Sequence, residues 1–504
     1  MSKAQRSFVT IRGLAAKALK YLQRLGWALS GVIITGLYLY YLQSQALPDL
    51  EYWHSEDIAE ELVPELQHFA NVDLAAYLAH EKKLFKRLDQ VITERSAGLP
   101  LWHRYNEQFY AAHRKTWPMG NMSSLRTPED RRGAALLVHG LSDSPYSMHA
   151  LSDSLLAAGF QTLNLRMPGH GTMPGALQNV GWRQFRASYQ LAVRALAKDL
   201  APEEPLILVG YSNGAALAVD YALRSLAQDS ELPQADLLLL VSPAVQAPSV
   251  AAYARIQRWV SELPGMEKLG WTEVLAEYDP FKYNSFPVYT AEQIHQLTSR
   301  LQKNLRQLSA AQREQFPALI AFQSVVDATI PPRSIVQGLL DHLGNTPAEL
   351  VLFDINRGSA MLPLLRTTEL RLQEELQARP VLNFELTVVG NDSDDPSRVS
   401  IRRKAAGSSQ WQESPTEMQW PKNIFSLSHV ALPFSAEDPT YGPANKDGLM
   451  SLGELWFKGE HGVLGVPLRL LARQRYNPFF PYMERRIIEA AESARTEKSK
   501  AAAN

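Results

Sequence analysis

The stretch LILVGYSNGAALAVDYAL, residues 206–223, decides the fold. It opens with four apolar residues, continues as Gly210-Tyr211-Ser212-Asn213-Gly214, and ends in apolar residues at helical spacing. A strand, a sharp turn and a helix are therefore predicted in that order, with Ser212 at the turn. Small neighbours let such a turn pack closely and force the serine hydroxyl outward. The pentapeptide alone also fits a plain strand-to-helix turn, so the prediction depends on its context.

On both sides of this stretch, short apolar runs alternate with helical sequence. From residue 134 the order is ALLVH, PYSMHALSDSLLAAG, FQTLNLRM, the 206–223 stretch and DLLLLVSP. Alternating strands and helices predict an α/β fold, with a parallel sheet and helices on both of its faces. The strands are apolar throughout, as expected when both faces of a parallel sheet are covered.

Three segments carry a resemblance to a known family: LLVHGLSDSP at 136–145, RMPGHG at 166–171 and GYSNG at 210–214. In this order and spacing they resemble the α/β-hydrolases, in the monoacylglycerol-lipase and carboxylesterase branch. The resemblance is close over residues 134–245 and looser as far as 434. It implies the α/β-hydrolase fold with a helical lid, a serine nucleophile at Ser212, and no metal or organic cofactor.

The resemblance also indicates an oxyanion hole, which is a pair of N–H groups that stabilises negative charge on a reacting oxygen. The family places one donor after a His-Gly pair, which here is the amide of Leu141, following His139 and Gly140. The second would be the amide of Asn213, directly after the nucleophile. The side chains of His139 and His170 are interpreted as structural.

A serine nucleophile needs a base and an acid that orients the base, and the family order is serine, acid, histidine. Asp327 follows the apolar run ALIAFQSVV and precedes Ala-Thr-Ile-Pro-Pro, which resembles the family's strand-end aspartate. Asp354, at the end of the next apolar run, is the alternative acid and also fits an ordinary turn.

Four histidines follow Ser212 in the chain: His295, His342, His429 and His461. His295 belongs to the predicted lid, and His342 follows Asp327 too soon. His429, in Leu-Ser-His-Val-Ala-Leu-Pro, resembles the family's late histidine loop, whereas His461 lies in a Gly-Glu-His-Gly turn and is the alternative. The chain between Asp327 and His429 is longer than the family usually has, so an insertion is predicted at about 357–420.

The N-terminus contains a candidate membrane anchor. Residues 25–48 carry no charged side chain, all charges before them are basic, and acidic residues follow. A single transmembrane helix at 25–46 is predicted, with residues 1–24 as a cytoplasmic leader and the catalytic part on the outer, periplasmic or extracellular side. A buried core helix and a secretory signal cleaved after Ala46 are the alternatives.

The remaining domain boundaries follow from the hydrophobic pattern. The pattern of residues 47–128 predicts an amphipathic helical lead-in. Residues 129–484 are predicted to form the hydrolase domain, with a lid at about 244–315. The polar segment 391–419 within the insertion reads as an exposed loop or hairpin. Residues 485–504 form a charged tail, expected to be a frayed helix or disordered.

Composition narrows the function. The net charge of −1 over 504 residues gives no electrostatic reason for nucleic-acid binding, and the absence of cysteine excludes disulfides and cysteine nucleophiles. The sequence thus predicts a membrane-anchored serine hydrolase that cleaves small-molecule or lipid-like carboxylic esters, and it specifies no oligomeric state. A peptidase, thioesterase or acyltransferase using the same residues, or a non-catalytic scaffold, are the alternatives. The aromatic residues of the lid suit an acyl chain or simply pack the lid.

Overall fold

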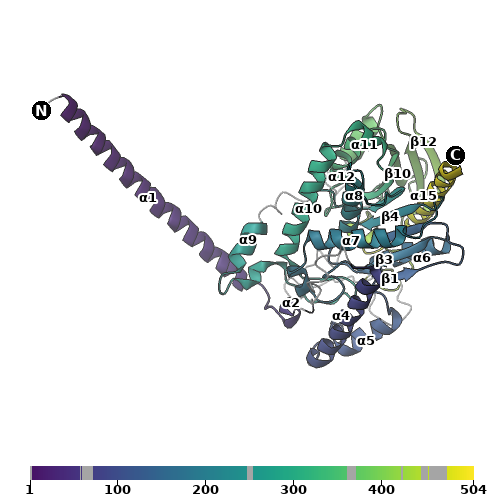
Figure 1. The fold of residues 1–504 in the computed structure, drawn as a ribbon, viewed down its shortest axis with the longest axis horizontal. Helices are drawn as coiled ribbons and strands as arrows, with labels where there is room; N and C mark the ends of the chain where they lie inside the picture. The colour runs from purple at the N-terminus through teal and green to yellow at the C-terminus, as the bar shows by residue number, and fades with distance from the viewer. Residues whose placement is uncertain are drawn as a thin grey trace.

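The computed structural model describes residues 3–56, 58, 72–246, 254–359, 371–421, 424–443, 452 and 474–503. A large α/β body carries one long N-terminal helix that projects away from it (Figure 1). The predicted parallel sheet covered by helices is confirmed.

Ten strands form the central sheet, in the order β1-β3-β2-β4-β5-β8-β9-β10-β11-β12. The strands from β2 to β10 in this sheet pair in parallel, while β1, β11 and β12 are antiparallel to their neighbours. Their bounds are β1 Ser124–Arg126, β2 Ala134–Val138, β3 Gln161–Leu165, β4 Leu206–Tyr211, β5 Leu237–Val241, β8 Ala318–Ser324, β9 Ala348–Phe353, β10 Glu385–Asn391, β11 Arg398–Lys404 and β12 Gln412–Gln419.

Alternate residues of each central strand point to opposite faces of the sheet. In β4, Leu206 and Leu208 belong to one apolar cluster, and Ile207 and Val209 belong to the other. Helices α7 (Trp182–Ala197), α8 (Asn213–Ser225) and α12 (Pro332–Gly338) contribute to the first cluster. Helices α6 (His149–Ala157) and α15 (Phe480–Ala503) contribute to the second. Both faces are therefore covered, which explains why these strands are apolar without alternation.

Helix α15 corrects the expectation of a frayed or disordered tail at 485–504. It continues to Ala503, and Ile487, Ala490 and Ala491 are buried against the sheet. Apolar residues at spacings of three and four give this charged helix one face that packs on the core.

Within the predicted insertion at 357–420, strands β11 and β12 pair as a hairpin, which confirms the hairpin alternative for the polar segment 391–419. After helix α13 (Arg371–Ala378), strand β10 joins the sheet beside β9, and the β11–β12 hairpin then extends the sheet outward. The added residues between Asp327 and His429 therefore enlarge the sheet. Residues 360–370, 422 and 423 lie outside the described part of the chain.

The lead-in contains helices α2 (Tyr52–Ser55), α4 (Leu74–Arg95) and α5 (Glu107–Thr116), and the predicted helical stretch at 60–69 lies outside the described residues. Helix α4 packs on the body through apolar residues that include Tyr77 and Leu78, and through polar contacts with Arg166. Tyr77 Oη donates to the carbonyl of Arg166 at 2.8 Å, and the guanidinium of Arg166 lies 3.1 Å from the carboxylate of Glu81. The lead-in is thereby joined to the RMPGHG segment.

The segment between β5 and β8, where a lid was predicted, is mostly helical. It contains α9 (Ala254–Ser261), a short 3₁₀ helix η6 (Glu267–Gly270), α10 (Val288–Arg306) and α11 (Ala310–Glu314). A small two-stranded sheet pairs β6 (Trp271–Glu273) with β7 (Phe286–Pro287). Residues 247–253 are outside the described part.

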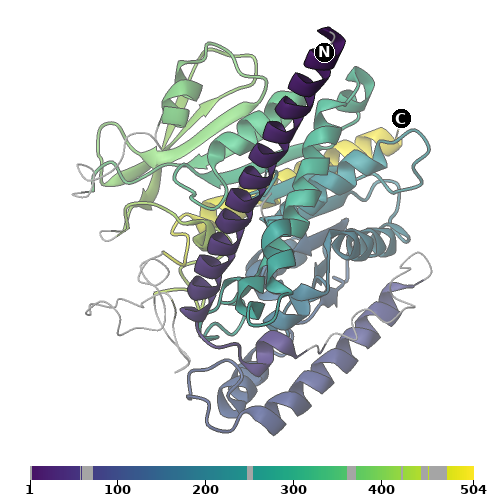
Figure 2. The ribbon, with the colours of Figure 1, turned by 90° about the vertical axis from the view of Figure 1, so that its left-hand side faces the viewer.

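Helix α1 spans Lys3–Gln45, and its portion Leu19–Gln45 has a mean hydropathy of 1.5, long and apolar enough to cross a membrane. The apolar part is not buried inside the protein, so the alternative of a core helix is wrong. A signal sequence would pass the same test of length and composition. Figure 2 shows this helix crossing in front of the body.

Two buried histidines of the lead-in, His54 and His103, predict an acid-sensitive fold. Burial lowers the pKa of both His54 and His103 to about 4. The Nδ1 atom of His54 accepts from the amide of Glu51 at 2.9 Å, so this nitrogen must be unprotonated in the folded protein.

Between pH 6.5 and 4 the unfolded chain binds protons at these positions and the folded chain does not. Stability is therefore expected to fall as the pH drops through this window, by up to roughly 1.4 kcal/mol per pH unit for each histidine. Urea unfolding at several pH values checks this, with His54→Gln giving a shallower slope. An unchanged slope in that variant would contradict the assignment.

Candidate active site

Ser212 lies on a strained turn between β4 and α8. Its φ is 53° and its ψ is −109°, a left-handed conformation that is rare for a residue with a side chain. A Cβ atom at Gly210 would lie 2.4 Å from the amide nitrogen of Ala215, and one at Gly214 would lie 2.0 Å from the carbonyl oxygen of Val138. Both positions thus require glycine, and the Gly-x-Ser-x-Gly spacing follows from packing.

The structure brings the three predicted residues together in one hydrogen-bonded chain. Nε2 of His429 is 3.1 Å from Oγ of Ser212, and Nδ1 of His429 is 2.8 Å from Oδ2 of Asp327. His429 begins a 3₁₀ turn, and its carbonyl accepts from Tyr211 Oη at 3.2 Å, which ties the histidine loop to the strand that carries the serine. With the carboxylate accepting at Nδ1, Nε2 is free to accept the serine proton.

The carboxylate of Asp327 is held by four further donors. Oδ1 accepts from the amides of Thr329 and Ile330, both at 2.8 Å, and Oδ2 accepts from Ser242 Oγ at 3.1 Å and Gln323 Nε2 at 3.0 Å. Burial alone raises the pKa of Asp327, but His429 and the hydrogen bonds outweigh it, so the net pKa is lowered. The acid is therefore ionised at neutral pH.

Ser242 and Gln323 were not predicted from the sequence. Each has a weak local signal: Ser242 directly follows β5, and Gln323 is an amide within the apolar strand β8. Ser242 also has a positive φ of 44°. Because β5 and β8 are neighbours in the sheet, the side chains of Ser242 and Gln323 both reach the carboxylate of Asp327.

Gln323 is expected to position the carboxylate of Asp327. In Gln323→Leu, one charge-assisted hydrogen bond is lost, so kcat for a short ester is expected to fall about tenfold. The acidic limb of the kcat/KM profile should also move to higher pH, because a less stabilised carboxylate holds protons more tightly.

The matched control is Gln302→Leu, since Gln302 is another buried amide that donates to the carbonyls of Val245 and Gly338. That variant should lose stability without moving the acidic limb. If the pH profiles of kcat/KM were the same in both variants, Gln323 would have only a structural role.

The two predicted oxyanion donors lie beside the serine. Leu141 and Asn213 line the same cavity as Ser212, and Asn213 is the first residue of α8, where the helix dipole adds positive potential. The loop that carries Leu141 is held by Tyr283, whose amide donates to the carbonyl of Ser142 at 2.8 Å. The arrangement could stabilise a negative oxygen near Ser212.

The side chains interpreted as structural make backbone contacts. Nε2 of His139 accepts from the amide of Met167 at 3.0 Å, so Nδ1 carries the proton and donates to the carbonyl of Gly140 at 2.8 Å. Burial lowers the pKa of His139 well below its ordinary value. His170 is buried as well, and its Nδ1 lies 2.9 Å from the carbonyl of Pro168.

The alternative acid and bases lie elsewhere. Asp354 forms an ion pair with Arg357, with a distance of 2.7 Å from Oδ2 to Nε. His295 lies in α10 and His342 in the turn Leu340–His342. His461 lies outside the described residues.

A cavity of about 470 Å³ surrounds Ser212 and His429. Its outer wall comes largely from α9 and α10, with Ala254, Val288, Ala291 and Ile294. Apart from His429, the charged residues that line it within the described part of the chain are Asp143 and Lys282, which pair with each other at 2.6 Å. The cavity is therefore mainly apolar and offers no unpaired carboxylate there.

The aromatic residues noted in the lid mostly pack the protein. Trp271, Tyr278, Phe281 and Tyr283 are buried and do not line this cavity, whereas Trp259 is exposed. Tyr253 lies outside the described residues. The aromatic content of the segment thus reflects core packing more than an acyl pocket.

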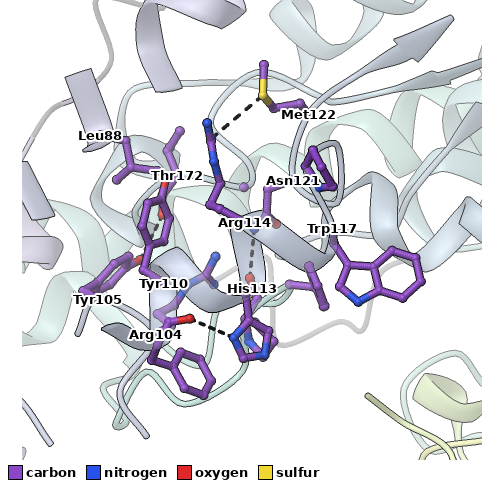
Figure 3. A pocket seen from close by; sticks show the side chains of 15 residues that line it. Leu88, Arg104, Tyr105, Tyr110, His113, Arg114, Trp117, Asn121, Met122 and Thr172 are labelled. Carbon is purple, nitrogen blue, oxygen red and sulfur yellow. Dashed lines mark hydrogen bonds between the residues drawn. The ribbon is translucent and has the colours of Figure 1, made fainter. Parts of the chain in front are cut away.

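A second cavity lies between the lead-in and the body (Figure 3). It shares no lining residue with the Ser212 cavity, and its volume of about 20 Å³ has room for about one water molecule. Among the described residues, no cluster of three or more His, Cys, Asp or Glu could hold a metal ion.

Residues 129–355 match the model of the serine aminopeptidase S33 family. This match confirms the resemblance to the α/β-hydrolases that the sequence motifs indicated, and the fold is that of an α/β-hydrolase. The matched range includes Ser212 and Asp327 and ends before His429.

Several solved structures are similar to about half of the chain. One of the metagenome-derived lipolytic enzymes LipS and LipT is 20% identical, with a TM-score of 0.37, over 51% of this chain and 96% of that one. A monoacylglycerol lipase from Paleococcus ferrophilus is 19% identical, with a TM-score of 0.36, over 46% and 88%. A soluble variant of the monoglyceride lipase from Saccharomyces cerevisiae is 15% identical, with a TM-score of 0.34, over 46% and 82%. No curated protein sequence is significantly similar to the chain.

Proposed function

We propose that this α/β-hydrolase is a membrane-anchored serine hydrolase that cleaves carboxylic esters. The observation that carries the proposal is the chain of hydrogen bonds from Ser212 through His429 to an ionised Asp327. A serine hydroxyl is a weak nucleophile at neutral pH, and this arrangement supplies both a base and the acid that orients it. Strain at Ser212 supports the same role, because backbone strain is retained where it serves a site.

The proposed reaction has two halves. His429 takes the proton of Ser212 as Oγ attacks the ester carbonyl, and the resulting oxyanion accepts hydrogen bonds from the amides of Leu141 and Asn213. His429 then gives its proton to the departing alcohol, which leaves an acyl-enzyme. Water attacks this intermediate with His429 again as the base, which releases the carboxylic acid and restores the serine.

Peptide hydrolysis is the second candidate, because the matching family is described as serine aminopeptidases. An aminopeptidase must neutralise the ammonium group of its substrate. The lining carboxylate of Asp143 already pairs with Lys282, and burial raises its pKa despite that lysine. This environment favours a neutral acyl group over a charged peptide terminus.

The proposed nucleophile can be tested with a fluorophosphonate probe on the full chain, followed by peptide mapping. We expect covalent labelling at Ser212, because the probe reacts with activated serines. Labelling of the folded protein at no serine would favour a non-catalytic scaffold. A panel of p-nitrophenyl esters graded by chain length, set beside aminoacyl p-nitroanilides, then separates esterase from aminopeptidase activity.

The proposed anchor is α1, with the N-terminus cytoplasmic and the hydrolase domain on the outer side. The basic residues before the apolar span and the acidic residues after it support this orientation. Digestion of the body by protease added to spheroplasts, whose outer face of the inner membrane is accessible, tests the topology, and protection of the body in spheroplasts would overturn it.

A further inference from the structure

Helix α9 carries two large apolar side chains that point away from the protein, beside the exposed Arg255 and Arg258. Ile256 is 62% exposed and Trp259 is 67% exposed, whereas Ala254 and Val260 on the same short helix are buried. Ile256 and Trp259 are three residues apart, so they lie on one side of the helix. Large exposed apolar side chains on a lid helix indicate a surface that contacts something apolar.

This helix lies beside the end of the candidate membrane span (Figure 1). The apolar span ends at Gln45, whose side chain donates to the carbonyl of Gly265 at 3.3 Å. Just beyond the span, Lys268 donates to the carbonyl of Leu47 at 2.9 Å and to Asp49 at 2.7 Å. The segment that follows α9 is therefore attached to the membrane-proximal end of α1.

Helix α9 is also a wall of the cavity around Ser212. Ala254 and Gln257, on the inner side of the helix, line that cavity, while Ile256 and Trp259 do not. One short helix thus separates the site from the surface next to the end of α1.

We propose that α9 docks on the bilayer, with Ile256 and Trp259 inserted among the outer-leaflet lipids, and that the ester substrate is a membrane lipid taken up past this helix. The proposal rests on the proposed function, because it requires α1 to span a membrane and Ser212 to cleave esters. The occupant is a lipid surface because the contacts of Gln45 and Lys268 hold the segment at the depth where the apolar span ends. Tryptophan suits that depth, since its ring is amphipathic.

The docking of α9 on the bilayer can be measured independently of ester hydrolysis. The chain has no cysteine, so Ile256→Cys can carry a single environment-sensitive fluorophore such as NBD. The full chain is placed in phosphatidylcholine–phosphatidylglycerol vesicles with and without doxyl-labelled lipids. Ser393→Cys, an exposed position in the turn between β10 and β11, is the matched control.

We expect blue-shifted emission and several-fold stronger quenching by doxyl lipids at position 256 than at position 393. Equal quenching at the two positions would overturn the proposal. A blue shift at 256 without lipid quenching would also overturn it, because the helix would then be covered by protein, such as a second copy of the chain.

The consequence for substrate is tested with Ile256→Asp combined with Trp259→Asp. Hydrolysis of a monoacylglycerol in the same vesicles is expected to fall at least about tenfold, while turnover of soluble p-nitrophenyl acetate is unchanged. The control pair is Leu101→Asp with Val381→Asp, two exposed apolar positions far from α9 in sequence, which should affect neither substrate.

Unchanged vesicle hydrolysis in the α9 variant would overturn the role of α9 in substrate capture. Absence of ester hydrolysis in every protein, including the unmodified chain, would refute the proposed function, whereas the fluorescence result would still decide the docking.

Discussion

Replacing Ser212 by alanine is expected to lower kcat for p-nitrophenyl acetate by about 10⁶-fold. The hydroxyl is the proposed nucleophile, and removing it leaves His429 and Asp327 without a group to activate. Stability should change little, because the hydroxyl contributes one hydrogen bond and no apolar packing. Alanine also retains the Cβ, so the strain of the turn is not relieved.

Single-turnover kinetics of the full chain in detergent measure the expected loss of activity. Thermal unfolding of the same protein checks that stability changes little. Ser225→Ala is the matched control, because Ser225 is a buried serine on the same helix whose Oγ donates to the carbonyl of Ala222. That variant should retain full activity. Substantial turnover in Ser212→Ala, with Ser225→Ala unchanged, would defeat the assignment of the nucleophile.

The second large effect concerns stability: Glu81→Ala is expected to lower the free energy of unfolding by about 3–5 kcal/mol. Glu81 and Arg166 are each 2% exposed, and their side chains lie 3.1 Å apart. Glu81 also accepts from the amide and hydroxyl of Ser123, at 2.6 and 2.8 Å. Without the carboxylate, the charge of Arg166 and the donors of Ser123 stay buried with fewer partners.

Urea unfolding measures this loss, and Glu94→Ala is the control because Glu94 is exposed on the same helix. The control should change stability by less than about 0.5 kcal/mol. Adding Arg166→Leu should recover part of the loss caused by Glu81→Ala, since the buried charge is removed as well. A loss in Glu81→Ala no larger than in Glu94→Ala would show that this buried pair does not hold α4 on the body.

The parts of the fold that could be predicted depend on residues near one another in the chain. The strand, turn and helix around Ser212 were predictable because apolar spacing and the two glycines specify them locally. The same holds for α1, whose apolar length is visible without any tertiary contact. The packing of residues 485–503 was harder to predict from the sequence. Charged residues dominate this segment, and only a few apolar residues form the face that packs on the sheet.

The candidate site was only partly predictable. Asp327 and His429 were predicted from a resemblance in motif order. No local sequence pattern shows that two residues 102 positions apart are in contact. The cost of closing a loop grows slowly with length, so the added strands β10, β11 and β12 can separate the two residues while the contact remains. Gln323 and Ser242 had no motif to mark them.

By itself, then, the sequence determined the α/β alternation, the sharp turn at Ser212 and an apolar N-terminal helix, because each arises from the spacing of neighbouring side chains. Tertiary structure alone decided which imidazole and which carboxylate meet that serine, what holds the carboxylate of Asp327, and where α9 lies relative to the end of α1. Those outcomes depend on strand order and helix packing, which bring together atoms that are far apart along the chain.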